Sequence, residues 1–78
     1  MFIVYVLRSE EGLRYIGQTA NLTQRLEAHN LGLSKWTKRG TNWKLVHMEE
    51  YDTRSEAMKR EKCLKTGKGR EELDLLLE

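Results

Sequence analysis

The amino-acid sequence predicts a small α/β (α+β) domain, in which a three-stranded antiparallel sheet is flanked by helices in the order ββαβαα. Three observations lead to this prediction. Two runs rich in β-branched and aromatic residues stand at the start of the chain and are joined by a glycine-containing turn. A third run, with alternating apolar and polar residues, lies near the middle. Two segments with helix-capping signatures stand before and after that third run.

The strands are predicted from residue type and alternation. Residues 2–7 (FIVYVL) are typical of a buried strand, and residues 9–12 are typical of a turn. The chain should return in a shorter strand from Arg14 to Thr19, which completes a hairpin. We expect a third strand from Trp43 to Tyr51.

The first helix is predicted from Asn21, a favoured N-cap residue, with Gln24 three residues later as its capping-box partner. It should run to about His29 and end at residues 30–32 (NLG), since asparagine and glycine favour helix ends.

The second helix is predicted to begin at the capping box of residues 53–56 (TRSE) and to run through Lys65. Thr66-Gly67 should end it. A short terminal helix is expected from about Arg70, and its apolar face is predicted to carry Leu73, Leu76 and Leu77.

Composition limits the class of protein. A chain of 78 residues is expected to form one domain over residues 1–78. Its apolar runs are too short to span a bilayer, and no signal-peptide pattern follows Met1. Cys63 is the single cysteine, which excludes an internal disulfide and favours a cytoplasmic location. His29, His47 and Cys63 do not have the spacing of a zinc site.

Charge is distributed unevenly along the chain. Residues 35–70 contain eleven basic and five acidic residues, a net charge of +6, whereas residues 71–78 contain four acidic residues and no basic one. A basic block of this kind is typical of proteins that bind a phosphate backbone. A solvated lysine-rich surface is the alternative interpretation.

Glu61 is the first candidate functional residue. With about 100° per residue, Glu61 is predicted to lie within the apolar sector of its helix, between Ala57 and Met58. A carboxylate there is costly unless a cation or hydrogen bonds compensate for its burial. Two interpretations follow: a boundary residue paired with a lysine, or a ligand of Mg²⁺, which prefers carboxylate oxygens.

Arg25 and His29 are the second candidate pair, four residues apart along one edge of a helix. They are interpreted either as an exposed arginine beside a half-buried histidine or as a phosphate clamp with an imidazole for proton transfer. Tyr5 shares a strand face with Ile3 and Leu7, so core packing with a hydrogen-bonded hydroxyl is its alternative to a catalytic role.

Taken in order, these residues resemble the GIY-YIG nuclease family over roughly residues 2–70. The second triad of the family, Tyr15-Ile16-Gly17, is matched in full. The first is Ile3-Val4-Tyr5, which lacks the glycine and has valine in place of isoleucine. The next segment of the family is similar to Gln18 to Leu22 and Arg25 to Asn30. The small single-domain branch of the family is similar in Leu45-Val46 with Glu49, Glu56-Ala57, Arg60 to Lys62 and Leu64 to Gly67.

The resemblance implies an endonuclease that hydrolyses DNA to 5′-phosphate and 3′-hydroxyl ends, of the structure-selective kind used in DNA repair or recombination. It implies one Mg²⁺ or Mn²⁺ ion with Glu61 as sole protein ligand. Tyr5 would be the candidate general base, and Tyr15 would help to position the attacking water. Arg25 would stabilise the phosphoryl charge, and His29 would assist proton transfer or hold Tyr5.

The basic segments are predicted to hold the DNA backbone, and Trp36 is available to stack on an exposed base. The candidate nucleic-acid-binding residues are Lys35, Trp36, Lys38, Arg39, Lys65, Lys68 and Arg70. For the residues from Lys65 to Arg70, a glycine-terminated helix end is the alternative.

Two other functions remain open from the sequence. One is a catalytically silent nucleic-acid-binding module on the same fold, and the other is a protein-interaction module that uses the acidic, leucine-rich tail. The predicted partner of an active nuclease is branched or single-stranded DNA, with no membrane. Specificity would come from substrate shape, from a homodimer formed through Leu73, Leu76 and Leu77, or from a separate targeting protein.

Overall fold

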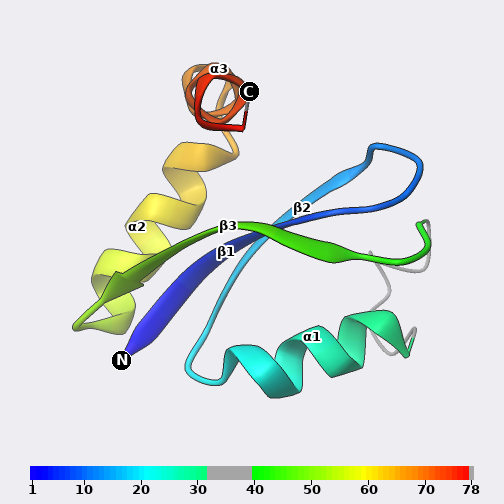
Figure 1. Cartoon of the computed structure of the whole chain (residues 1–78). Helices are drawn as coiled ribbons and strands as arrows, with labels where there is room; N and C mark the ends of the chain where they lie inside the picture. Colours follow the sequence, from blue (N-terminus) through cyan, green and yellow to red (C-terminus); the bar gives the residue numbers. More distant parts are fainter. Residues whose placement is uncertain (32–39, 78) are drawn as a thin grey trace.

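The computed structural model describes residues 1–31 and 40–77 and has the predicted order of elements. The strands are β1 (Phe2–Arg8), β2 (Arg14–Thr19) and β3 (Lys44–Tyr51), and the helices are α1 (Leu22–Asn30), α2 (Arg54–Leu64) and α3 (Gly67–Leu76). The sheet is antiparallel throughout, with β1 in the centre and the order β2-β1-β3 (Figure 1). The predicted fold class is confirmed.

Helices cover both faces of the sheet (Figure 1). Successive side chains of a strand point to opposite faces, so β1 contributes to two cores. Val4 and Val6 pack with Ala57 and Leu64 of α2, while Tyr5 and its neighbours on the other face pack against α1. The second core is made by Tyr5, Leu7 and Trp43, with Ile3, Tyr15, Leu22 and Leu26 at its border. Tyr5 therefore lies beneath α1, on the face opposite α2.

The N-caps explain where two helices begin. The side chain of Asn21 accepts a hydrogen bond from the backbone N–H of Gln24, and the side chain of Thr53 accepts one from that of Glu56. The predicted return bond from the Gln24 side chain is replaced, because the N–H of Asn21 donates to Oγ1 of Thr19.

The start of the terminal helix was predicted wrongly. Thr66 does not end a helix but caps the next one, since its side chain accepts a hydrogen bond from the N–H of Gly69, and α3 therefore begins at Gly67 rather than near Arg70. Gly69 is buried where α3 meets the end of α2, and an added Cβ would collide with the backbone of Cys63 and Leu64. Tertiary packing thus overrides the low helix propensity of glycine.

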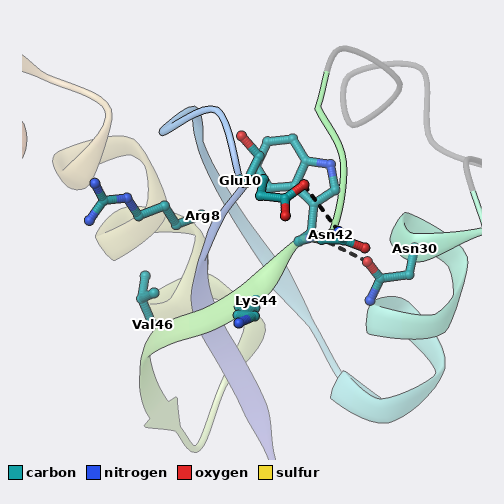
Figure 2. A pocket seen from close by; sticks show the side chains of 8 residues that line it. Arg8, Glu10, Asn30, Asn42, Lys44 and Val46 are labelled. Atoms are coloured by element: carbon teal, nitrogen blue, oxygen red, sulfur yellow. Dashed lines mark hydrogen bonds between the residues drawn. The ribbon is translucent and has the colours of Figure 1, made fainter.

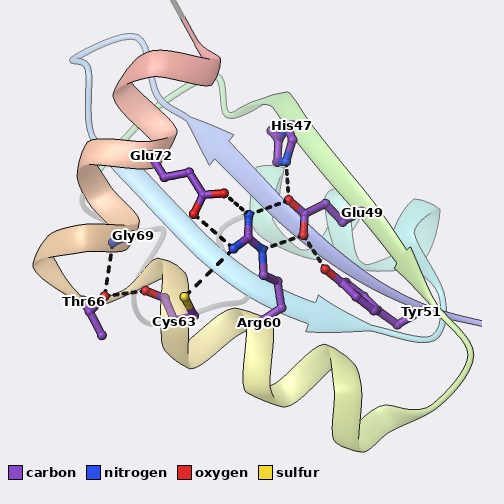
Figure 3. A network of polar contacts seen from close by, with 8 residues as sticks. All are labelled: His47, Glu49, Tyr51, Arg60, Cys63, Thr66, Gly69 and Glu72. Carbon is purple, nitrogen blue, oxygen red and sulfur yellow. Dashed lines mark hydrogen bonds and ion pairs between the residues drawn. The ribbon is translucent and has the colours of Figure 1, made fainter.

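A polar network fastens α2 and α3 to β3 (Figure 3). The guanidinium of Arg60 donates to Glu49 on β3, at 2.7 and 3.1 Å, and to Glu72 on α3, at 2.7 and 3.1 Å. Glu49 also contacts His47 Nε2 at 2.8 Å and accepts from the hydroxyl of Tyr51 at 2.6 Å. A single arginine therefore links three elements.

No helix within residues 1–31 and 40–77 has the length and apolar character needed to cross a membrane.

Candidate active site

The structure brings together three of the candidate residues from three elements. Tyr5 of β1 and His29 of α1 are joined by a hydrogen bond of 2.9 Å between the phenol oxygen and Nε2. Tyr15 of β2 completes the cluster, with its ring centroid 4.7 Å from that of His29 and 6.1 Å from that of Tyr5. Tyr5 and His29 are buried, whereas Tyr15 is half-buried. The cluster therefore has one partly exposed member.

Arg25 lies one helical turn before His29 and acts on the same phenol. Burial raises the pKa of Tyr5 to about 12, while hydrogen bonding by Arg25 and its positive charge lower it. Burial first, and then the charge of Arg25, lower the pKa of His29 below its usual 6.5. At neutral pH, Tyr5 is therefore a neutral phenol and His29 a neutral imidazole.

The hydrogen bond between the two neutral groups has two possible directions. The phenol donates to Nε2 of His29 when the imidazole carries its proton on Nδ1, and it accepts from Nε2–H in the other tautomer. The positive charge of Arg25 lowers the pKa of the phenol and so favours release of its proton. The site thus holds a phenol in direct contact with an imidazole that can exchange a proton with it.

Gly17 allows this cluster to form. It lies directly opposite Tyr5 in the pairing of β1 with β2, so both residues share the α1 face. A Cβ at residue 17 would lie 2.7 Å from the Tyr5 hydroxyl and 3.0 Å from the Tyr15 ring. The glycine of the second triad thus provides the space for the phenol.

Glu61 lies on α2, which packs against the other face of the sheet, and its carboxylate forms an ion pair with Lys65 at 2.8 Å. The side chain is 23% exposed, so it lies at the border of the helix core as expected. The apolar face predicted for this helix was too wide, because Met58 is 43% exposed and the buried residues of α2 are Ala57 and Leu64. The lysine-paired interpretation therefore describes the observed contact.

The residues around Glu61 can accommodate one hydrated divalent ion. In the part of the chain that the structure describes, no three His, Cys, Asp or Glu side chains form a metal-binding cluster. Gln18 lies opposite Val4 and so faces α2, and its Oε1 is buried without a hydrogen-bond partner among the described residues. The single carboxylate of Glu61 fits an ion that keeps most of its water, as Mg²⁺ does, and does not fit a dehydrated, fully protein-ligated ion.

A hollow of about 710 Å³ lies beside β2, the outer strand next to the tyrosine cluster. Its lining comes from β2, the end of α2 and α3, and consists of Arg14, Tyr15, Ile16, Lys65, Arg70 and Leu73. Tyr15 belongs both to this hollow and to the cluster with His29, while Lys65 belongs both to the hollow and to the ion pair with Glu61. The hollow therefore lies between the tyrosine cluster on one face of the sheet and Glu61 on the other face.

The candidate nucleic-acid-binding residues divide into two groups. Lys65 and Arg70 line the hollow, and Lys68 is exposed in the first turn of α3 rather than in a loop. The remaining candidates, Lys35, Trp36, Lys38 and Arg39, lie outside the described residues.

The leucines predicted to form a dimer surface do not form one exposed face. Leu73 is fully buried in the core between α2 and the sheet, and Leu77 packs against the same core. Leu76 is 51% exposed and Leu75 is 73% exposed. The amphipathic pattern of α3 thus reflects its packing within this chain.

A second hollow, of about 530 Å³, is lined by residues from the end of β1, the end of α1 and the start of β3 (Figure 2). There Asn30 accepts a hydrogen bond from the backbone N–H of Trp43, and Asn42 donates to Glu10. None of the predicted catalytic residues lines it.

Two residues of β2, the strand that carries Tyr15, were not singled out from the sequence. Arg14 was interpreted only as the first residue of a strand, and Gln18 only as part of a similar segment. Alternation along β2 could have indicated them, because it places Gln18 on the face opposite Gly17 and puts Arg14 beside Tyr15 at the edge of the sheet.

Comparison with known proteins gives a family and two kinds of relatives. Residues 1–73 match the GIY-YIG catalytic domain. UPF0213 proteins from Staphylococcus aureus strains Mu50 and MW2 are each 38% identical over 76 residues, which cover 96% of this chain and 93% of theirs. The solution NMR structure of a UPF0213 protein from Bacillus halodurans is similar with a TM-score of 0.60 and 29% identity, covering 97% of this chain and 85% of that one.

Proposed function

This chain belongs to the GIY-YIG family, and on that premise we propose that it is a metal-dependent DNA endonuclease that leaves 5′-phosphate and 3′-hydroxyl ends. The observation that carries the proposal is the hydrogen bond between the Tyr5 phenol and a neutral His29, beside Tyr15 and Arg25. A phenol in contact with a base and a cation is suited to moving a proton from an attacking water.

The proton would leave along the cluster. Tyr5 is fully buried, whereas Tyr15 borders an open hollow, so Tyr15 is assigned to contact and position the water. Tyr5, the candidate base, has a pKa of about 12 and would not ionise alone at neutral pH. It would take up the proton of the water as it passes its own to Nε2 of His29, so that Tyr5 stays a neutral phenol and the positive charge resides on the His29 imidazole.

Arg25 would act on the phosphate. It is exposed, carries a permanent charge and lies beside the phenols. Its guanidinium can donate two parallel hydrogen bonds to phosphoryl oxygens, and these strengthen as negative charge develops in the transition state.

Glu61 would hold one Mg²⁺ or Mn²⁺, and a bound ion supplies Lewis-acid activation of the phosphate and stabilisation of the leaving oxygen. The carboxylate must first release Lys65, whose side chain is 52% exposed and can move into solvent. Because solvent reaches the lysine of the pair and screens it, loss of the pair costs on the order of 1 kcal/mol.

The proposed setting is DNA repair or recombination in the cytoplasm, on branched or single-stranded substrates. The single cysteine, Cys63, is free, and it is exposed, which suits a reducing compartment.

The experiment is a cleavage assay with end-labelled branched, flapped, single-stranded and double-stranded DNA, with Mg²⁺ or with EDTA. Glu61→Gln is expected to lower the cleavage rate on the order of 100-fold or more, because the only proposed protein ligand is lost. Glu50→Gln, which changes an exposed glutamate of β3, is the matched control and should cleave normally. Cleavage by Glu61→Gln at the wild-type rate would exclude the metal-ligand role.

A catalytically silent nucleic-acid-binding module is the second candidate. It is favoured by the ion pair of Glu61 with Lys65, which satisfies the carboxylate without a metal. In that case, the wild-type chain would bind every DNA substrate and cleave none in Mg²⁺ or Mn²⁺.

A further inference from the structure

We propose that the hollow beside β2 is a subsite for the phosphodiester backbone of the substrate strand, held by Arg14, Lys65 and Arg70. The inference rests on the proposed function, because it takes DNA as the ligand. It adds Arg14 to the predicted contacts and places the strand along the outer edge of the sheet.

The lining of the hollow has the required charge. Three of its six residues are basic and none is acidic. They come from β2, from the C-cap of α2 and from α3, so the concentration of charge results from the fold rather than from a run in the sequence. The remaining lining includes the half-buried apolar side chain of Ile16, which is suited to the sugar surface. A concave site with one sign of charge raises the local concentration of an anion.

Each of two cations has a carboxylate partner that a phosphate can replace. Asp74 accepts from Arg14 at 2.6 Å and is 62% exposed, and Glu61 pairs with the exposed Lys65. Ion pairs that solvent reaches are weak, so they compete poorly with a ligand. Arg70 is exposed and has no ion pair within the described residues. The free protein thus holds two of its three cations in pairs that can exchange.

The position of the hollow suits a strand that leads to the reacting phosphate. Tyr15 lines the hollow, and its ring also packs against that of His29, with 4.7 Å between ring centroids and an interplanar angle of 58°. A backbone held by Arg14 and Arg70 therefore passes the exposed side of the tyrosine cluster. Phosphate contacts of this kind fix the register of the strand and carry no base preference.

The test measures binding without catalysis. A fluorescein-labelled single-stranded oligonucleotide is titrated in EDTA at several salt concentrations, and fluorescence anisotropy gives the dissociation constants. Arg14→Gln and Arg70→Gln are each expected to weaken binding and to reduce the log–log salt slope by about 0.7, the value for one phosphate contact on a single strand. Lys59→Gln, which removes an exposed lysine of α2 that does not line the hollow, should keep the wild-type slope.

Asp74→Asn provides a test by gain of affinity. Removing the carboxylate that pairs with Arg14 is expected to tighten binding roughly two- to fivefold. Glu71→Gln makes the same change in charge at another exposed position of α3 and should have a smaller effect. The gain must disappear in the Arg14→Gln/Asp74→Asn double variant. If Glu71→Gln tightens binding as much as Asp74→Asn, the effect is general electrostatics and the subsite is excluded.

The same titration with other ligands identifies the chemical group that the hollow binds. Oligonucleotides with and without a 5′-phosphate should bind equally, because the subsite is assigned to the backbone. Much tighter binding of the phosphorylated form would overturn that assignment in favour of a terminal phosphate, and equal binding of polyglutamate would favour an acidic peptide.

If the wild-type chain binds and cleaves DNA while Arg14→Gln and Arg70→Gln keep its salt slope, this inference alone fails. If it neither binds nor cleaves any DNA, the proposed function fails.

Discussion

Replacement of Glu49 by glutamine should loosen the attachment of α2 and α3 to the sheet. Arg60 holds the pKa of Glu49 down, from its ordinary 4.5 to about 2. The carboxylate is 20% exposed, so solvent screens it only in part. The difference between these pKa values corresponds to roughly 3 kcal/mol of stabilisation, an upper figure for this ion pair.

The pH dependence follows from the direction of this change. Glu49 binds a proton more weakly in the folded chain than in the unfolded one. Its contribution is therefore fully present above about pH 4.5 and is lost as the pH falls towards 2. Glu49→Gln should lower the free energy of unfolding by about 2–3 kcal/mol at pH 7 and flatten the stability curve between pH 4.5 and 2. For a domain of this size, that is a fall in Tm of roughly 10–20 °C.

Urea unfolding followed by tryptophan fluorescence is the assay, because Trp43 is buried in the core. Glu50→Gln, at the next and exposed position of β3, is the control. Glu11 also has its pKa lowered to about 2, chiefly by the backbone N–H of Thr41, so the quantity compared is the difference between each variant and the wild type. A Glu49→Gln variant within about 0.5 kcal/mol of wild type, or one with the same acid dependence, would refute the reasoning.

Three further predictions concern the active site. Arg25→Ala should lower the cleavage rate by more than it weakens DNA binding, which kinetic and anisotropy measurements can compare. Because the pKa of His29 lies below 6.5, cleavage should persist below pH 6.5 and then fall in acid, and His29→Gln should remove this acid limb from the pH–rate profile. Gly17→Ala should lower the free energy of unfolding in urea by about 1–3 kcal/mol, since its Cβ meets the Tyr5 hydroxyl, whereas equal stability would exclude close packing there.

Much of the fold could be predicted because its signals are local. The N-caps at Asn21 and Thr53 act over three residues, and strand alternation acts over two. Gly17 within a predicted strand likewise indicates that another group approaches the strand closely, and the structure shows that this group is the Tyr5 phenol.

The three-residue error at α3 marks the limit of local signals. Lys65-Thr66-Gly67 has the composition of a helix end, but Thr66 caps a new helix whose Gly69 packs on α2. The same limit applies to Leu73, since an apolar stripe predicts burial without indicating whether the covering surface belongs to this chain or to a second copy.

The sequence by itself determined the order of strands and helices, the residue types of the candidate site and the basic character of the second half of the chain. Only the tertiary structure decided that the Tyr5 phenol is hydrogen-bonded to His29 and that Arg14 joins Lys65 and Arg70 around one hollow. Capping and alternation depend on neighbours within one turn or one strand. The site instead joins residues 24 to 56 positions apart, whose separation in space depends on the packing of two helices on opposite faces of the sheet.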